Sequence, residues 1–199
     1  ETAVTPICIG SNTDPYQPIE AKLKLTQSII EVLVECEHPF SIITKSDLIT
    51  RDLDLLAPLA KNRLCNIAVS VTTLNNQLKR ILEPRTPCGQ KRLGTIKALT
   101  DAGINVTMMA APMIPFINDQ ELESLLKKGL SAGASDARYI LIRLPLEVSD
   151  LFRDWLKVHF PDRAAKVMNV IRECRGGMDY KSGFGDRMSG TGEFAKLLH

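Results

Sequence analysis

Short apolar runs alternate along the chain with longer segments in which apolar residues recur at helical spacing. Strands are predicted at 6–10, 40–44, 66–71, 105–110 and 138–144, and helices at 20–36, 51–62, 75–82, 91–102, 118–133, 147–159 and 162–174. Such alternation is typical of strand–helix units stacked on a parallel sheet. The pattern therefore predicts an α/β fold, either a partial barrel or an open sheet.

Several helix ends carry their own signals. Gly103 is a suitable left-handed cap for the helix before it, and Asn118 followed by Glu121 predicts a capped helix start. After residue 175 the chain is rich in glycine and poor in apolar residues. We therefore expect one domain over residues 1–175 and an irregular C-terminal strap over 176–199.

Composition excludes several classes of protein. The 199 residues are 44% hydrophobic and 24% charged, which suits one globular domain with a large core. The formal charge of +2, without a long run of like charges, does not identify a partner. No run of eighteen apolar residues occurs, so we expect no membrane span.

The five cysteines are odd in number and widely scattered, which argues against a disulfide framework and for a reducing, cytoplasmic location. Residues 1–3 lead directly into a strand pattern, with neither an initiator Met nor a signal sequence. We expect the chain to begin within a longer protein.

Polar residues follow the predicted strands at the edge where α/β proteins bind ligands. The first strand stops in the turn Ser11-Asn12-Thr13-Asp14, and Lys45 stands at the end of the second strand. The alternative for the turn is a set of local side-chain-to-backbone hydrogen bonds before Pro15. For Lys45 the alternative is a solvated helix start.

Two further strand ends carry polar groups. Ser70 and Thr72 end the third strand, although neighbouring Thr73 could serve only to cap the next helix. Arg143 is a charged residue at an otherwise apolar strand end, so it is a candidate to face a substrate or cofactor. A buried ion pair is the alternative for Arg143.

Five segments, taken in order, resemble the radical S-adenosylmethionine enzymes, in the group related to spore photoproduct lyase. They are Ile9–Glu20, Ile43–Ser46, Val69–Thr73, Leu82–Arg85 and Ala111–Pro115, and the resemblance runs from about Val4 to the last residues. It implies a partial TIM-type (βα)6-like barrel whose first strand is missing from this chain. It also implies two cofactors, S-adenosylmethionine and a [4Fe-4S] cluster.

The resemblance implies roles for the polar residues. Asn12 or Thr13 would hydrogen-bond the amino or carboxylate end of S-adenosylmethionine, and Asp14 would accept from its ammonium. Lys45 would meet the carboxylate of the same ligand, and Ser70 would line the site.

Three further residues are implied to bind the cofactor. Thr72 would extend the lining by Ser70, and Ile114 would offer an apolar face to the adenine. Arg143 would face substrate or bound cofactor. Phe116 stands where the family usually has glycine, which puts the local backbone shape in question.

The sequence departs from the family at two places. The Cys-x3-Cys-x2-Cys triplet that holds the cluster is absent, so its ligands are expected upstream of Glu1, and we interpret each cysteine present as a small buried hydrophobic residue. Ser11 stands where spore photoproduct lyase has its hydrogen-donating cysteine. Repair of spore photoproduct is therefore not the expected reaction.

The leading hypothesis is the core of a radical S-adenosylmethionine enzyme with an unknown substrate, possibly nucleic acid, and an electron donor such as flavodoxin or ferredoxin. One alternative is a non-catalytic nucleic-acid binding module, which would bind in a strongly salt-dependent way. The other is a cluster-free barrel enzyme, such as an aldolase that forms a Schiff base at Lys45.

Overall fold

The predicted strands form one sheet. In the computed structural model, which describes residues 4–183 and 185–198, five strands lie in the order β1-β2-β3-β4-β5. The pairs β1–β2, β2–β3 and β3–β4 are parallel. The strands are β1 (Ile7–Ile9), β2 (Phe40–Thr44), β3 (Cys65–Ser70), β4 (Val106–Met113) and β5 (Asp136–Leu141). This arrangement confirms the predicted α/β class.

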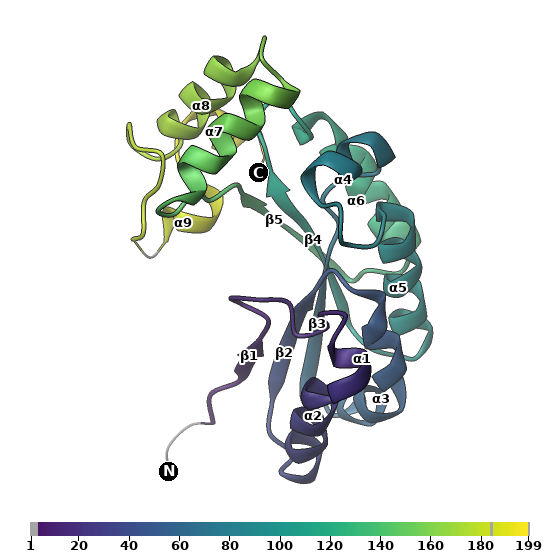
Figure 1. The fold of residues 1–199 in the computed structure, drawn as a ribbon. Coiled ribbons are helices and arrows are strands. Elements are labelled where there is room, and N and C mark those ends of the chain that lie inside the picture. Colours follow the sequence, from purple (N-terminus) through teal and green to yellow (C-terminus); the bar gives the residue numbers. More distant parts are fainter. Residues whose placement is uncertain (1–3, 184, 199) are drawn as a thin grey trace. The chain divides into compact units, whose positions relative to one another are not determined.

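Helices connect successive strands (Figure 1). They are α1 (Glu20–Leu23), α2 (Leu25–Glu35), α3 (Leu53–Lys61), α4 (Asn76–Leu82), α5 (Gly89–Asp101), α6 (Leu122–Ser131), α7 (Val148–His159), α8 (Ala164–Glu173), α9 (Asp186–Ser189) and α10 (Glu193–Leu197). Two 3-10 segments, η1 (Asp47–Asp52) and η2 (Asp119–Glu121), precede α3 and α6. None of the described helices is long and apolar enough to cross a membrane.

Helices α2, α3 and α5 lie on one side of strands β1 to β3 (Figure 1). Because side chains alternate between the faces of a strand, the residues of β2 and β3 separate into two sets. Ile42 and Ile67 are paired in register and fully buried, whereas the next pair, Ile43 and Ala68, is only half-buried. The apolar side chains of the first set build the core under the helices.

The chain divides into two compact units, and the boundaries fall within β4, α6 and β5. The first unit is Glu1–Met109 with Leu125–Arg138, and the second is Ala110–Ser124 with Tyr139–His199. Each unit is described here by itself. Residues 1–3, on which the expectation of a longer protein depended, lie outside the described residues.

Two local predictions were wrong. The helix predicted over residues 20–36 is interrupted at Lys24, whose φ of 53° ends α1 and starts α2. Asn118 does not cap the following helix: its Oδ1 accepts from the Ile114 N–H at 2.7 Å and its Nδ2 donates to the Pro112 carbonyl at 2.9 Å. The amide of Asn118 therefore braces the segment after β4.

In the second unit, the C-terminal segment packs against β5 and α8. Leu141, Cys174 and Ala195 are buried together, and the Thr191 N–H donates to the Cys174 carbonyl at 3.0 Å. Residues 176–199 include the short helices α9 and α10. The proposed division of the chain at residue 175 stays a prediction.

Asp179 fastens the start of this segment to α7 and α8. Its carboxylate accepts from the Ser149 hydroxyl at 2.6 Å and from Arg172 Nε at 2.8 Å, and it forms an ion pair with Arg153. Burial alone would raise the pKa of Asp179, but these three donors outweigh it and lower the pKa to about 2. The carboxylate therefore stabilises the folded state whenever it is ionised.

We predict that Asp179→Asn lowers the free energy of unfolding at pH 7 by about 2 kcal/mol, the equivalent of nearly two pKa units. Because the folded-state pKa is depressed, this stabilisation is complete above the ordinary pKa of 3.8 and is lost as the pH falls toward about 2. Urea unfolding at several pH values measures it. The matched control is Asp154→Asn in an exposed pair with Lys157, which should change stability by less than about 0.5 kcal/mol. An effect of Asp179→Asn that is equal at pH 7 and pH 2.5 would contradict the assignment.

Candidate functional site

The turn after β1 crosses the end of β2 at very short range. Gly10 has a φ of 91°, and a Cβ at that position would lie 2.2 Å from the Ile43 carbonyl oxygen. Only glycine adopts this backbone without strain and leaves room for the neighbouring chain. Gly10 therefore allows the polar turn to lie beside the first residues after β2.

Asp14 fastens this turn to β2. Its Oδ1 accepts from the Tyr16 N–H at 2.9 Å and from the Thr44 hydroxyl at 2.7 Å, and its Oδ2 accepts from the Lys45 N–H at 2.7 Å. The contact with Tyr16 is one of the local bonds that formed the alternative hypothesis for the turn. The other two contacts are long-range and fix the backbone of Lys45.

The rest of the motif is bound into the first unit by a second carboxylate. The Tyr16 hydroxyl donates to Asp52 Oδ2 at 2.9 Å, and Arg51 Nε donates to Asp52 Oδ1 at 2.8 Å. Burial and the nearby charge of Asp52 raise the pKa of Tyr16 above its ordinary value. Arg51 also pairs with Glu20 at 3.0 Å. The charged and aromatic residues of the turn motif thus have structural roles, and the expected contact of Asp14 with the cofactor ammonium stays a prediction.

Three polar side chains near these strand ends have no such role. Asn12 and Thr13 are exposed and form no hydrogen bond with another described residue. The Ser70 hydroxyl also has no hydrogen-bond partner in the described part of the chain, although the residue is only 5% exposed. Their donors and acceptors are available to a ligand.

Lys45 and Arg92 share one carboxylate, that of Glu83. Lys45 Nζ forms an ion pair with Glu83 Oε1, and Arg92 Nη2 lies 2.6 Å from Glu83 Oε2. The Lys45 side chain is 31% exposed, whereas those of Glu83 and Arg92 are 10% and 2% exposed. Burial alone would raise the pKa of Glu83, but the charges and hydrogen bonds of Lys45 and Arg92 hold it below its usual range. Glu83 is therefore ionised, and the three groups together carry one net positive charge.

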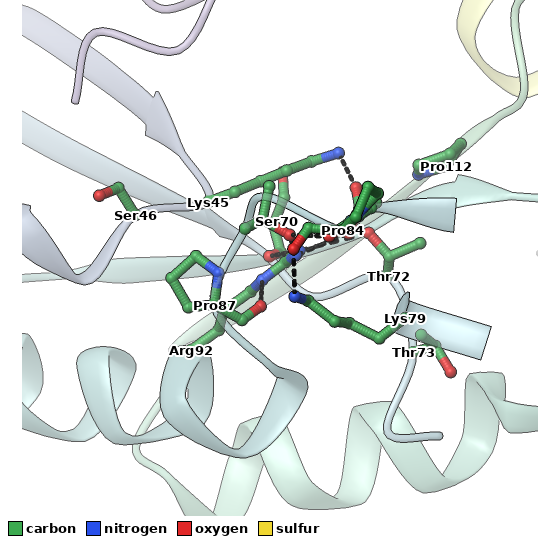
Figure 2. Close-up of polar contacts among 12 residues, drawn as sticks. Lys45, Ser46, Ser70, Thr72, Thr73, Lys79, Pro84, Pro87, Arg92 and Pro112 are labelled. Carbon is green, nitrogen blue, oxygen red and sulfur yellow. Dashed lines mark hydrogen bonds and ion pairs between the residues drawn. The ribbon is translucent and has the colours of Figure 1, made fainter. Parts of the chain in front are cut away.

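Arg92 joins this ion pair to the end of β3. Its Nη1 donates to the Ser70 carbonyl at 2.9 Å and, at 3.4 Å, to the Thr72 hydroxyl, while its Nε donates to the Pro87 carbonyl at 2.9 Å. Figure 2 shows Lys45, Ser70, Thr72 and Arg92 gathered around the loop that contains Pro84. Contacts within the chain thus connect Lys45 to Ser70 through Glu83 and Arg92.

Sequence reasoning missed Glu83 and Arg92 as members of this cluster. The sequence did contain a signal for Arg92. Ile96 and Leu99 follow it by about one and two helical turns, so Arg92 falls on the buried face of α5. An arginine on such a face needs a carboxylate partner.

The remaining predicted residues belong to the second unit. Ile114 is fully buried, and its N–H is bound by Asn118, so its contact with adenine stays a prediction. Phe116 has a φ of 60°, the left-handed conformation for which glycine is favoured. Phe116 thus adopts a backbone conformation that glycine also adopts. Arg143 is half-buried and its Nη2 donates to the Tyr180 hydroxyl at 2.9 Å.

The cysteines do not fit an iron–sulfur cluster. Within residues 4–183 and 185–198, no group of three or more His, Cys, Asp or Glu side chains could hold a metal. The interpretation as buried hydrophobic residues holds for Cys65, whose pKa burial raises to about 11, and for Cys174. It was wrong for Cys8 and Cys36, which are exposed.

Comparisons with known proteins agree on one family. The model of the Radical SAM superfamily matches residues 3–129. An uncharacterised protein of Mycobacterium tuberculosis is 33% identical over 168 residues, which cover 83% of this chain and 49% of that protein. An uncharacterised protein of Methanocaldococcus jannaschii is 29% identical over 163 residues, or 82% of this chain and 60% of that protein. The chain thus spans about half the length of the curated relatives it matches.

A solved structure shows the same fold. A mutant of spore photoproduct lyase superposes with a TM-score of 0.55 over 79% of this chain and 46% of that one, at 16% sequence identity. At this identity the likeness concerns the fold alone, and it agrees with a partial barrel of parallel strands. With the family match over more than half of its residues, the chain belongs to the radical SAM superfamily.

Proposed function

We propose that this chain is the S-adenosylmethionine-binding core of a radical enzyme that acts on a substrate still to be identified. Family membership supports the cleavage of S-adenosylmethionine at this coarse level. The observation that carries the finer proposal is the cationic cluster of Lys45, Glu83 and Arg92 beside the unpaired hydroxyl of Ser70. Lys45 follows β2 and Ser70 ends β3, so both lie at the carboxyl ends of the strands, the edge where barrels of this kind carry their chemistry.

S-adenosylmethionine supplies a 5′-deoxyadenosyl radical when a [4Fe-4S] cluster reduces it by one electron. The described residues do not fit the cluster, so the proposal places its cysteines upstream of Glu1 and includes an electron donor such as flavodoxin or ferredoxin. The residues of this chain bind the cofactor, orient it and exclude water.

Lys45 is the proposed partner of the cofactor carboxylate. The net positive charge of the cluster would be neutralised by one carboxylate, and the ammonium of Lys45 is its most exposed cation. An ammonium has three protons, so Lys45 can keep its bond to Glu83 while donating to the ligand. The Asp14 carboxylate accepts a hydrogen bond from the Lys45 N–H and so fixes the backbone of Lys45.

The neutral side chains complete the proposed contacts. Ser70 would donate to the same carboxylate, and Asn12 or Thr13 would bond its neighbouring polar groups. Thr72 would act through Arg92, with which it shares a hydrogen bond. Asp14 already accepts three donors, so one of its roughly four acceptor positions is left for the cofactor ammonium.

We predict that Lys45→Met weakens the binding of S-adenosylmethionine about 10- to 100-fold, because a hydrogen bond to a charged group contributes about 1.5–3 kcal/mol. Ser70→Ala should weaken it about 2- to 10-fold. The dissociation constant is measured by anaerobic calorimetry on the longest natural form of the protein, loaded with its cluster. Lys97→Met is the matched control, because Lys97 is exposed and paired with Asp101 on α5. Equal affinities of the wild type and Lys45→Met would refute the assignment.

The ion-pair cluster of Lys45, Glu83 and Arg92 is tested separately by the free energy of unfolding. We predict that Glu83→Gln lowers the free energy of unfolding by about 3 kcal/mol, because the almost fully buried Arg92 loses its carboxylate. Asp101→Asn removes the carboxylate of an exposed pair and should cost less than about 0.5 kcal/mol. Urea unfolding at pH 7 compares the two variants. If both changes are equally small, Glu83 does not compensate Arg92 and the cluster lacks the electrostatic role given to it here.

A further inference from the structure

Two buried or half-buried guanidinium groups of the second unit form no ion pair with a carboxylate of residues 4–183 and 185–198. They belong to Arg143, two residues after β5, and Arg175, two residues after α8. Four other half-buried or buried arginines are paired with acids: Arg51 with Asp52 and Glu20, Arg92 with Glu83, and Arg153 and Arg172 with Asp179. A buried cation is costly unless it is paired and hydrogen-bonded. Arg143 and Arg175 thus carry a half-buried and a buried positive charge that no ion pair neutralises.

Arg175 is a structural cation. It is 1% exposed, and four backbone carbonyls accept from it: those of Asp186 and Arg187 from Nη1, and those of Leu141 and Ile142 from Nη2. The carbonyl dipoles solvate its charge without neutralising it. Arg175 thereby ties the C-terminal segment to the end of β5.

Arg143 uses very little of its hydrogen-bonding capacity. Of its five N–H donors, one Nη2 proton reaches the Tyr180 hydroxyl at 2.9 Å. Its Nε is buried without a partner, and its Nη1 has no partner among the described residues yet is not among the buried atoms. Nη1 therefore offers its protons to solvent or to a ligand.

Tyr180 supports Arg143 from one side. The guanidinium carbon of Arg143 lies 5.6 Å from the centre of the Tyr180 ring, a cation–π distance that fixes the plane of the group. The Tyr180 hydroxyl accepts from Arg143 and keeps its own proton for another acceptor. Both residues thus hold donors for the same kind of ligand.

The local charge stays positive. The neighbouring Asp179 is already bound to Arg153 and Arg172, so it has little capacity left for Arg143. Burial lowers the pKa of Arg175 and the charge of Arg143 lowers it further, while the charge of Asp186, which is paired with Lys181, acts in the opposite direction. An anion bound here would offset the charge of Arg143.

We propose that Arg143, held against Tyr180 and backed by the charge of Arg175, binds a phosphate or carboxylate group of the substrate. The planar guanidinium matches the oxygen pairs of both anions, and the Tyr180 hydroxyl adds a donor. That the anion belongs to the substrate rests on the proposed function, whereas the binding of an anion at Arg143 does not. This interpretation assigns Arg143 to the substrate and not to S-adenosylmethionine.

The test uses the longest natural form of the protein and inorganic phosphate as the probe. Unfolding is followed by circular dichroism. Phosphate at about ten times its dissociation constant should raise the unfolding midpoint by about 3 °C over chloride of equal ionic strength. Acetate, compared in the same way, distinguishes a carboxylate from a phosphate as the preferred anion.

Matched variants locate the effect. Arg143→Gln should abolish the shift, whereas Arg138→Gln, which removes an exposed arginine of β5 paired with Asp136, should keep it. Arg143→Lys keeps the charge without the planar fork and should bind phosphate more weakly than the wild type, so it replaces Arg143→Gln if that variant does not fold. Tyr180→Phe should reduce the shift, because the ring stays and the hydroxyl is lost.

The proposal fails if neither anion shifts the wild-type midpoint, or if Arg143→Gln or Arg143→Lys responds as strongly as the wild type. The affinity for S-adenosylmethionine is measured on the same samples. A protein that loses the phosphate shift in Arg143→Gln but never binds S-adenosylmethionine would support the anion site and refute only the proposed function. Normal binding of S-adenosylmethionine, without any shift of the unfolding midpoint by phosphate or acetate, would support the proposed function and refute the anion site.

Discussion

The carboxylate of Glu83, shared between Lys45 and Arg92, is the interaction on which the arrangement of the candidate site depends. It joins the end of β2, the loop after α4 and the first turns of α5, and through Arg92 it reaches the backbone at the end of β3. Two cations around one acid leave a net positive charge, and only Lys45 is substantially exposed. The fold thereby presents one oriented ammonium at the edge of the sheet, which suits a ligand with a carboxylate.

Buried acids build the framework of the first unit, and neutral groups are left for binding. Asp14 fixes the turn after β1 by three hydrogen bonds, and Asp52 accepts from the Tyr16 hydroxyl, while Asn12, Thr13 and the Ser70 hydroxyl make no hydrogen bond with other described residues. In the second unit, by contrast, the guanidinium groups of Arg143 and Arg175 form no ion pair with a carboxylate of the described residues. One unit thus offers a fixed cation with neutral donors, and the other offers uncompensated positive charge.

Local patterns were sufficient to predict the strands, most helices and the α/β class, since apolar periodicity reports directly which face is buried. The hydrogen-bond and ion-pair partners of Asp14, Glu83 and Asn118 could not be predicted from the sequence, because tertiary packing decides which loops come close to these residues. Lys24 shows the same limit, as nothing in its apolar surroundings indicates a left-handed residue within a helical pattern. The resemblance to the family located Lys45 and Ser70, but it gave no sign that Glu83 and Arg92 connect them.

The central claim is that these strand ends hold S-adenosylmethionine for reductive cleavage. The most direct measurement is the release of 5′-deoxyadenosine by the longest natural form of the protein, reconstituted anaerobically, reduced in the presence of S-adenosylmethionine and compared with its Lys45→Met variant. The account predicts about four irons per chain in both proteins, with nucleoside released by the wild type and strongly reduced release by the variant. Full iron content without any 5′-deoxyadenosine, or equal release by the two proteins, would contradict it.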